Sequence, residues 1–158
     1  MPDQILLSHG YFLELDPIER KVMRPYPPLG LLYLSAYLKR AGRKVSVFDS
    51  TFSNPERLIE TLRESRPRFL GLYANLMTRS RIVGLMAQAR ELSIPVIAGG
   101  PDASGNAESY LTHGASVVVR GEGEVTLNEL LERWTGDTPP TDVAGTSVRI
   151  GDSITHAP

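Results

Sequence analysis

The residues best suited to chemistry follow short apolar runs, and glycine is prominent among them. The run Val96–Ala98 is followed by Gly-Gly-Pro-Asp at 99–102, and a later run by Arg-Gly-Glu-Gly-Glu at 120–124. Because glycine has no Cβ, both segments let a ligand lie against the main chain. The carboxylates of Glu122 and Glu124 are acceptors beside those open amides. This pattern indicates binding of a large ligand that carries amides and hydroxyls.

Polar side chains follow three further apolar runs in the same way. They stand at 8–9 (Ser-His), at 49–51 (Asp-Ser-Thr) and at 74–78 (Ala-Asn-Leu-Met-Thr). A small enzyme that uses Asp49, Asp102 or Glu122 as an acid or base is one interpretation. No paired base and nucleophile can be discerned from the spacing, so we predict no catalytic residue in this chain.

Five short apolar runs alternate with helical patterns, and this alternation must position those residues. Spacings of three and four between apolar residues predict helices around 31–41, 55–62, 82–89, 106–113 and 127–134. The predicted strands are Ile5–Leu7, Val45–Phe48, Phe69–Tyr73, Pro95–Ala98 and Ser116–Val119. Two further short strands, 146–150 and 153–156, read as a hairpin joined by a Gly-Asp turn.

The repeated strand-helix alternation predicts an α/β fold with a parallel sheet covered on both faces. We expect a doubly wound, Rossmann-like or flavodoxin-like sheet of five parallel strands in the order 2-1-3-4-5, with a C-terminal β-hairpin. Ligands of such sheets bind outside the carboxyl ends of the strands, where the strand order reverses. The connection from Ser8 to Pro28 leaves this edge and is long for such a fold, which is typical of a functional loop.

The amino-acid composition excludes several kinds of site and gives no support to several classes of partner. The chain has 158 residues and no cysteine, which excludes disulfides, zinc-thiolate sites and a cysteine-ligated iron–sulfur cluster within it. The formal net charge is −1, which gives no electrostatic reason to expect nucleic acid or an anionic membrane as a partner. No apolar run is long enough to span a bilayer and the start lacks a signal-peptide pattern, so we expect a cytoplasmic protein.

Three nucleotide- or phosphate-related motifs are absent at the predicted strand ends. The segment after the first strand, LLSHGYFLELD, lacks the G-x-G-x-x-G fingerprint for a dinucleotide, and no Walker pattern is present. A phosphorylation receiver would need paired acids, an Asp and a Lys at three strand ends. Those ends carry Ser8-His9, Tyr73-Ala74 and Arg120 instead.

Four segments, in order and spacing, resemble the N-terminal cobalamin (B12)-binding domain of B12-dependent radical SAM enzymes. They are PPLGLLYLSAYLKRAGRKVSVFDS, AGGPDAS, GASVVVRGEGEVTLNELLE and GTSVRIGDSITHAP. The last resembles the hairpin that leads into the radical SAM barrel of that family. The resemblance covers nearly the whole chain and implies a cobalamin-binding Rossmann-like domain over residues 1–136, with residues 137–158 as a linker and hairpin.

The resemblance also implies a set of cofactor-binding residues. The corrin would lie over the carboxyl edge of the sheet, with its nucleotide tail along that edge. Carried over position by position, the cofactor-binding residues would be Pro28, Leu29, Gly30, Tyr73, Ala74, Asn75, Gly99, Gly100, Pro101, Asp102, Gly121 and Glu122. On this basis Gly99-Gly100-Pro101 would make room for cobalamin.

The chain departs from the family pattern in three places. Asp102 stands where a histidine often follows Gly-Gly-Pro, and Tyr73 stands where the third strand often ends in Ser or Thr. The Asp-x-His-x-x-Gly motif of B12 mutases is also missing, since Leu7 occupies the position of its aspartate. We therefore predict no protein metal ligand and no histidine that replaces the lower axial ligand of the cobalt.

These observations predict a cobalamin-binding module of a B12-dependent radical SAM protein, such as a methyltransferase or a porphyrin ring cyclase-like enzyme. By this resemblance, a [4Fe–4S] cluster and S-adenosylmethionine would bind a barrel of the same polypeptide beyond Pro158, and this module alone would not catalyse the reaction. An alternative is a flavodoxin-like nucleotide-binding or protein-interaction module without B12.

Overall fold

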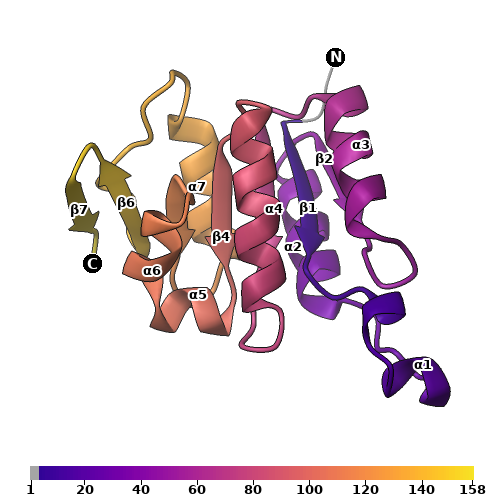
Figure 1. The fold of residues 1–158 in the computed structure, drawn as a ribbon. Coiled ribbons are helices and arrows are strands. Elements are labelled where there is room, and N and C mark those ends of the chain that lie inside the picture. Colours follow the sequence, from indigo (N-terminus) through magenta and orange to yellow (C-terminus); the bar gives the residue numbers. More distant parts are fainter. Residues whose placement is uncertain (1–3) are drawn as a thin grey trace.

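The computed structural model describes residues 4–158 as one α/β layer structure around a seven-stranded sheet (Figure 1). The strands are β1 (Ile5–His9), β2 (Val45–Phe48), β3 (Phe69–Tyr73), β4 (Val96–Gly99), β5 (Val117–Val119), β6 (Thr146–Ile150) and β7 (Ser153–His156). The helices are a 3₁₀ turn η1 (Leu13–Leu15), α1 (Glu19–Val22), α2 (Leu29–Arg40), α3 (Pro55–Ser65), α4 (Arg79–Glu91), α5 (Pro101–Gly105), α6 (Ala107–Thr112) and α7 (Glu124–Arg133).

The strand order is β2-β1-β3-β4-β5-β6-β7, and the first five strands are parallel. The predicted doubly wound fold and its order 2-1-3-4-5 are therefore confirmed. The hairpin continues the same sheet, because β6 pairs antiparallel with β5 and β7 pairs antiparallel with β6. As a result β7 runs in the direction of β5, and the chain returns to the carboxyl edge of the parallel strands.

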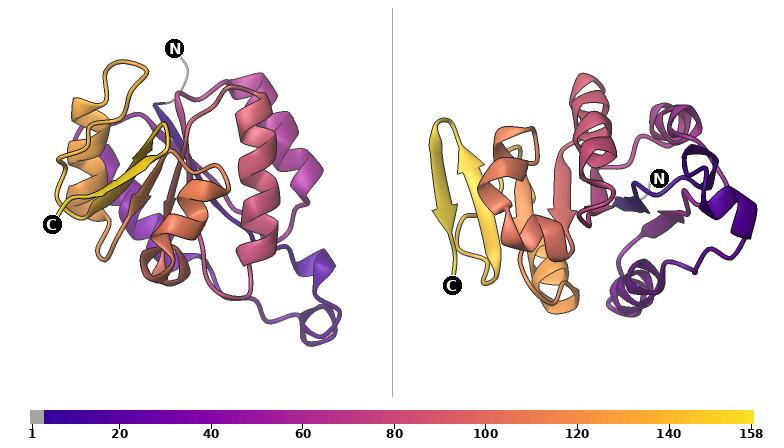
Figure 2. Two further views of the ribbon diagram at one scale, coloured as in Figure 1. Left: turned by 60° about the vertical axis from the view of Figure 1, so that its left-hand side comes forward. Right: turned by 60° about the horizontal axis from the view of Figure 1, so that its bottom comes forward.

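Helices cover both faces of the sheet, as the right-hand view of Figure 2 shows. One face packs Leu6, Leu70 and Val118 against α3, α4 and α6. The other face packs Ile5, Leu7 and Val117 against α2, α7 and the buried Trp134. Successive residues of a strand point to opposite faces, which is why β1 contributes to both cores. Two buried faces account for the near-continuous apolar strands in the sequence.

The connection from β1 to α2, residues 10–28, forms a strap that projects from the body with α1 at its tip (Figure 1). Asp16 starts α1 by accepting hydrogen bonds from the backbone N–H groups of Ile18 and Glu19, both 3.1 Å long. The pattern analysis predicted a long functional loop here but not its two short helical turns. Within residues 4–158, no helix has the length and apolar character required to cross a bilayer.

Candidate functional site

The crevice of this sheet lies between β1 and β3. The connection from β1 to β2 covers one face through α2, whereas the connection from β3 to β4 covers the other through α4. The two connections therefore diverge above the carboxyl ends of β1 and β3, where open α/β sheets bind ligands. Two adjoining cavities open at this edge.

The larger cavity, of about 490 Å³, lies between the strap and the ends of β1 and β3, and we call it the strap cavity. Its polar groups come from several connections. It is lined by His9, Tyr11, Asp16, Glu19, Arg24, Pro25, Tyr26, Pro27, Pro28, Leu29, Gly30, Leu31, Thr51, Tyr73, Asn75, Met77 and Thr78. A cavity with a broad mouth and scattered donors and acceptors suits a large ligand with polar substituents.

The second cavity, of about 190 Å³, lies between the sheet and the helices α2 and α7, and we call it the glycine cavity. It is largely apolar, with walls of leucine, isoleucine and valine and six glycines. It is lined by Leu7, Gly30, Leu31, Leu34, Gly71, Leu72, Tyr73, Ile97, Ala98, Gly99, Gly100, Val119, Gly121, Glu122, Gly123, Glu124 and Leu127. Gly30, Leu31 and Tyr73 line both cavities, so one extended ligand can occupy the two together.

Nine of the twelve residues predicted to bind the cofactor line these cavities. Pro28, Leu29, Gly30, Tyr73 and Asn75 line the strap cavity, and Gly30, Tyr73, Gly99, Gly100, Gly121 and Glu122 line the glycine cavity. The structure places Ala74, Pro101 and Asp102 beside the cavities without lining either one. The carboxylate of Asp102 instead faces Arg79 and Tyr110.

The glycines of this edge differ in how much space is free at the position where a Cβ would lie. A Cβ on Gly30 would meet no heavy atom within 4 Å, and one on Gly99 would lie 3.8 Å from the Val119 carbonyl oxygen. A Cβ on Gly100 would lie 2.6 Å from the Ala74 carbonyl oxygen and 3.0 Å from Tyr73 Cδ2. Gly100 also has a φ of +97°, which disfavours other residues. Gly30 and Gly99 therefore leave space for a ligand, whereas Gly100 leaves space for the β3 connection.

His9, at the end of β1, uses both ring nitrogens within the protein. Its Nδ1 accepts from the backbone N–H of Tyr11 at 3.2 Å, and its Nε2 lies 3.0 Å from Asp49 Oδ1. An Nδ1 that accepts a hydrogen bond places the proton on Nε2, which then donates to Asp49. Both ring nitrogens of His9 are therefore occupied by partners within the protein.

Asp49 is held in its ionised form by the same loop. Partial burial raises the pKa of Asp49, but hydrogen bonds from Thr51 and from His9 outweigh it and leave that pKa below its usual range. The backbone N–H of Thr51 donates to Asp49 Oδ1 at 3.0 Å. Asp49, which follows β2, thus holds His9 in the wall of the strap cavity at the end of β1.

Asn75 begins the turn that leads into α4. Its Oδ1 accepts from the backbone N–H of Thr78 at 3.0 Å, and its own N–H donates to Thr78 Oγ1 at 3.2 Å. Since the carboxamide oxygen is held by this turn, the Nδ2 group is the part of Asn75 suited to donate to a ligand in the strap cavity.

The residue-level predictions missed the strap side chains and the apolar walls of the glycine cavity. The strap contributes Tyr11, Asp16, Glu19, Arg24 and Tyr26, and its unusual length was the signal that pointed to them. Leu34 and Leu127 line the glycine cavity from α2 and α7. Their helical spacing predicted only packing, because a periodic pattern does not distinguish a core contact from a cavity wall.

Comparison with known proteins places this architecture among cofactor-binding domains. Residues 17–131 match the family model described as the B12 binding domain. A curated relative, the uncharacterized methyltransferase PH0819 of Pyrococcus horikoshii, is 27% identical over 159 aligned residues, covering 92% of this chain and 34% of the relative. The chain therefore spans about a third of the length of this relative.

Solved structures show the same fold. The radical S-adenosylmethionine methyltransferase TsrM from Kitasatospora setae superposes with TM-scores of 0.80 with tryptophan and a SAM analogue bound, and 0.78 with cobalamin and a [4Fe–4S] cluster bound. The sequence identities are 22% and 21%, and the matches cover 98% and 100% of this chain but 30% and 31% of TsrM. A de novo designed Rossmann 2x3 protein, 8% identical, has a TM-score of 0.54 over 85% of this chain and 93% of its own.

Proposed function

This chain belongs to the family of B12-binding domains, and we propose that it holds cobalamin across the strap cavity and the glycine cavity. The observation that carries the proposal is the match of residues 17–131 to that family, together with two adjoining cavities at the switch point of the sheet. Cobalamin joins a broad corrin ring, rich in amide substituents, to a nucleotide tail that ends in an aromatic base. The broad strap cavity, with its scattered polar groups, corresponds to the ring, and the narrower, largely apolar glycine cavity corresponds to the tail.

The residues present fit such a group. In the glycine cavity, a Cβ built on Gly30, Gly99, Gly121 or Gly123 would have no heavy atom closer than 3.8 Å, so backbone is open to the cavity at these positions. Leu34, Val119 and Leu127 offer apolar walls for the aromatic base of the tail. In the strap cavity, the Nδ2 group of Asn75 and the side chains of Tyr11 and Arg24 offer polar groups for the corrin amides.

When bound, cobalamin supplies a redox-active cobalt centre suited to group transfer. The residues of this chain then have a binding and orienting role. Tyr73, which lines both cavities and is 37% exposed, would separate the corrin side from the tail side. Asp49 holds His9 in the wall of the strap cavity, and both imidazole nitrogens of His9 are hydrogen-bonded within the protein. We infer that the domain orients the cofactor and carries out no chemistry alone.

We further propose that the domain works within a B12-dependent radical SAM protein, as a methyltransferase or a related enzyme. The chain covers 34% of the methyltransferase relative and contains no cysteine. Thiolate ligands for a [4Fe–4S] cluster, and with them S-adenosylmethionine, would therefore be supplied by a barrel outside residues 1–158. That barrel is the partner we propose for the open face of the cofactor.

Exposed apolar side chains at the carboxyl edge support a covering partner. Within the described part of the chain, eleven of the fifteen exposed large apolar side chains lie at strand ends, in the connections that follow, or in the first turn of the next helix. They are Leu15, Ile18, Val22, Met23, Tyr26, Leu29, Phe52, Tyr73, Leu76, Met77 and Val125. Exposed apolar side chains that gather at one edge of a sheet are typical of an interaction surface. Five of these side chains lie on the strap, which projects from the body of the domain (Figure 2).

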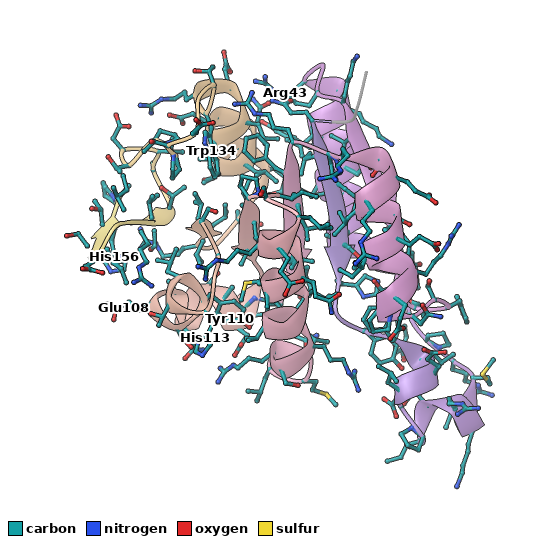
Figure 3. The ribbon with its side chains drawn as sticks, turned by 45° about the horizontal axis from the view of Figure 1, so that its top comes forward. Arg43, Glu108, Tyr110, His113, Trp134 and His156 are labelled. Atoms are coloured by element: carbon teal, nitrogen blue, oxygen red, sulfur yellow. The ribbon has the colours of Figure 1, made fainter. Side chains whose placement is uncertain are left out.

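The C-terminal residues are held at the same edge. Arg120, which follows β5, donates from its guanidinium to the carbonyl oxygens of Thr146 and Ala157. The backbone N–H of Gly145 donates to the Pro158 carbonyl at 2.7 Å. At the other side of the hairpin, His156 lies 3.5 Å from Glu108 of α6 and 2.7 Å from Ser147 Oγ (Figure 3). A segment after Pro158 would thus begin beside the Gly121-Glu122 loop.

Titration of the purified domain with hydroxocobalamin tests the binding function. We expect saturable, one-to-one binding, measured by visible absorbance and by calorimetry, because both cavities are formed without the barrel. Flavin mononucleotide and ATP serve as control ligands and should not compete. Saturable binding of a nucleotide, with no cobalamin binding at high micromolar concentration, would instead favour the alternative of a flavodoxin-like module.

The gene beyond codon 158 tests the proposed parent protein. We expect a Cys-x-x-x-Cys-x-x-Cys motif downstream, since three thiolates leave one iron of a [4Fe–4S] cluster free to bind S-adenosylmethionine. Sequencing of the complete reading frame provides the measurement. A stop codon directly after codon 158 would contradict the radical SAM parent without affecting the cobalamin titration.

A further inference from the structure

The short helix α5 touches three of the connections that line the two cavities. It follows Gly100 directly, so its first residue is covalently joined to the β4 connection. The backbone N–H of Asp102 donates to the Ala74 carbonyl at 3.3 Å, which ties α5 to the β3 connection. Ser104 Oγ accepts from the backbone N–H of Gly121 at 3.1 Å, which ties it to the β5 connection. Helix α5 is therefore joined directly to all three connections.

The carboxylate of Asp102 anchors α5 to the helices α4 and α6. Arg79 of α4 donates to both of its oxygens, from Nε at 2.7 Å and from an Nη at 2.5 Å. Tyr110 of α6 donates its hydroxyl at 2.6 Å, and Asn106 Nδ2 lies 3.3 Å away. Asp102 is only 8% exposed and Tyr110 only 1%. Two helices and the turn after α5 thus converge on one buried carboxylate.

The electrostatics of this group agree with its geometry. The hydrogen bonds from Arg79 lower the pKa of Asp102 and outweigh the opposing effect of burial. Burial and the bond to Asp102 together raise the pKa of Tyr110. The ionised carboxylate and the protonated hydroxyl are therefore the stable forms at neutral pH. A bidentate guanidinium–carboxylate pair fixes the orientation of the two groups as well as their distance.

We propose that Asp102 is a positioning residue for cobalamin: through Arg79 and Tyr110 it fixes α5, and α5 fixes the spacing of the three connections that hold the cofactor. This inference rests on the proposed function. It gives Asp102 a different role from the direct contact predicted from the sequence, because its carboxylate is directed to α4 and α6. A ligand that spans both cavities needs the connections from β3, β4 and β5 at fixed separations.

Variants of this group separate positioning from general stability. Asp102→Asn removes the charge, Tyr110→Phe removes one hydrogen bond, and Ser104→Ala removes only the tie to Gly121. We expect each to weaken hydroxocobalamin binding, by roughly tenfold for Asp102→Asn, the range seen when outer partners of a site are removed. The circular dichroism that the protein induces in the corrin bands should also change, because it reports the orientation of the bound ring.

Asp142→Asn is the matched control, since Asp142 pairs with Arg133 at 2.5 Å on α7 and lines neither cavity. It should leave affinity and induced dichroism unchanged. Unfolding in urea gives the folded fraction of each variant, so that affinities refer to folded protein. If Asp102→Asn and Ser104→Ala both keep the affinity and the induced dichroism of wild type, the positioning role is overturned. The proposed function would remain intact.

Hydrogen exchange of the ligand-free domain provides a readout that does not depend on cobalamin. In Asp102→Asn we expect faster exchange at the amides of Ala74, Asp102 and Gly121, relative to the amides of the central strands. A wild-type domain that binds no cobalamin would contradict the proposed function. Unchanged exchange at those three amides would contradict the positioning role by itself.

Discussion

Replacement of Gly30 by leucine is expected to weaken cobalamin binding by about a hundredfold, about 2.7 kcal/mol, and to leave the domain folded. Gly30 lies in the first turn of α2 and lines both cavities. A Cβ at this position meets no protein atom within 4 Å, so the backbone accepts a side chain here, at the junction of the two cavities. Titration with hydroxocobalamin and urea unfolding of the same sample provide the two measurements.

Gly84→Leu is the control for this variant. Gly84 is also helical and exposed, in α4, and a Cβ there likewise meets no atom within 4 Å, but Gly84 lines neither cavity. Both changes should stabilise their helices slightly, by up to about 1 kcal/mol, because glycine is a poor helix former. Only Gly30→Leu should lose affinity. Equal cobalamin affinity of the two variants would show that the junction of the cavities is not part of the binding site.

Most of the sheet could be predicted from the sequence because each parallel strand is short, apolar and followed by polar residues or glycine. Both faces of β1 are buried, so residues 5–7 read as an unbroken apolar run. The helix α3 was marked by Asn54, whose side chain caps it through the N–H of Arg57 at 2.8 Å, and by Pro55 at its first position. Local signals of this kind act over a few residues and need no knowledge of the fold.

The parts that could not be predicted depend on contacts between distant residues. Helix α5 occupies five residues that begin with proline, too few for a periodic pattern to be visible. It is held by the β3 and β5 connections and by Arg79, which lie 17 to 28 positions away from the residues they bond. The hairpin was predicted, but its pairing with β5 is a tertiary contact that its own residues do not reveal.

The location of the candidate site could be predicted from the sequence, but the roles of its residues could not. The expected carboxyl edge is where the cavities lie, because the strand order fixes the switch point and the flavodoxin-like order that we expected is the one observed. The roles of individual residues were harder to predict. Asp102 was one of the polar residues after a strand, yet its carboxylate is directed to Arg79 and Tyr110. Sequence position places a residue at an edge but does not say which way its side chain points.

The adjacent glycines of the Gly-Gly-Pro segment lead to the second large effect. Gly100→Ala is expected to destabilise the domain by about 2–4 kcal/mol, since its backbone conformation is almost exclusive to glycine and its new Cβ would overlap the β3 connection. Gly100 has φ +97° and ψ 173°, and the Cβ would stand 2.6 Å from the Ala74 carbonyl oxygen and 3.0 Å from the Ala74 nitrogen. Urea unfolding followed by the fluorescence of the buried Trp134 measures the change.

Gly99→Ala provides the matched comparison one residue earlier. Its φ is not positive, and its Cβ would make an ordinary contact of 3.8 Å with the Val119 carbonyl oxygen. We therefore expect its unfolding free energy to stay within about 1 kcal/mol of wild type, with any loss of cobalamin affinity arising in the glycine cavity itself. In Gly100→Ala, affinity should fall because the connections of β3 and β4 move apart. Equal unfolding free energies of the two variants would contradict this prediction. They would show that the β3 connection can move to accommodate a side chain at Gly100, and any loss of affinity would then arise in the glycine cavity, as for Gly99→Ala.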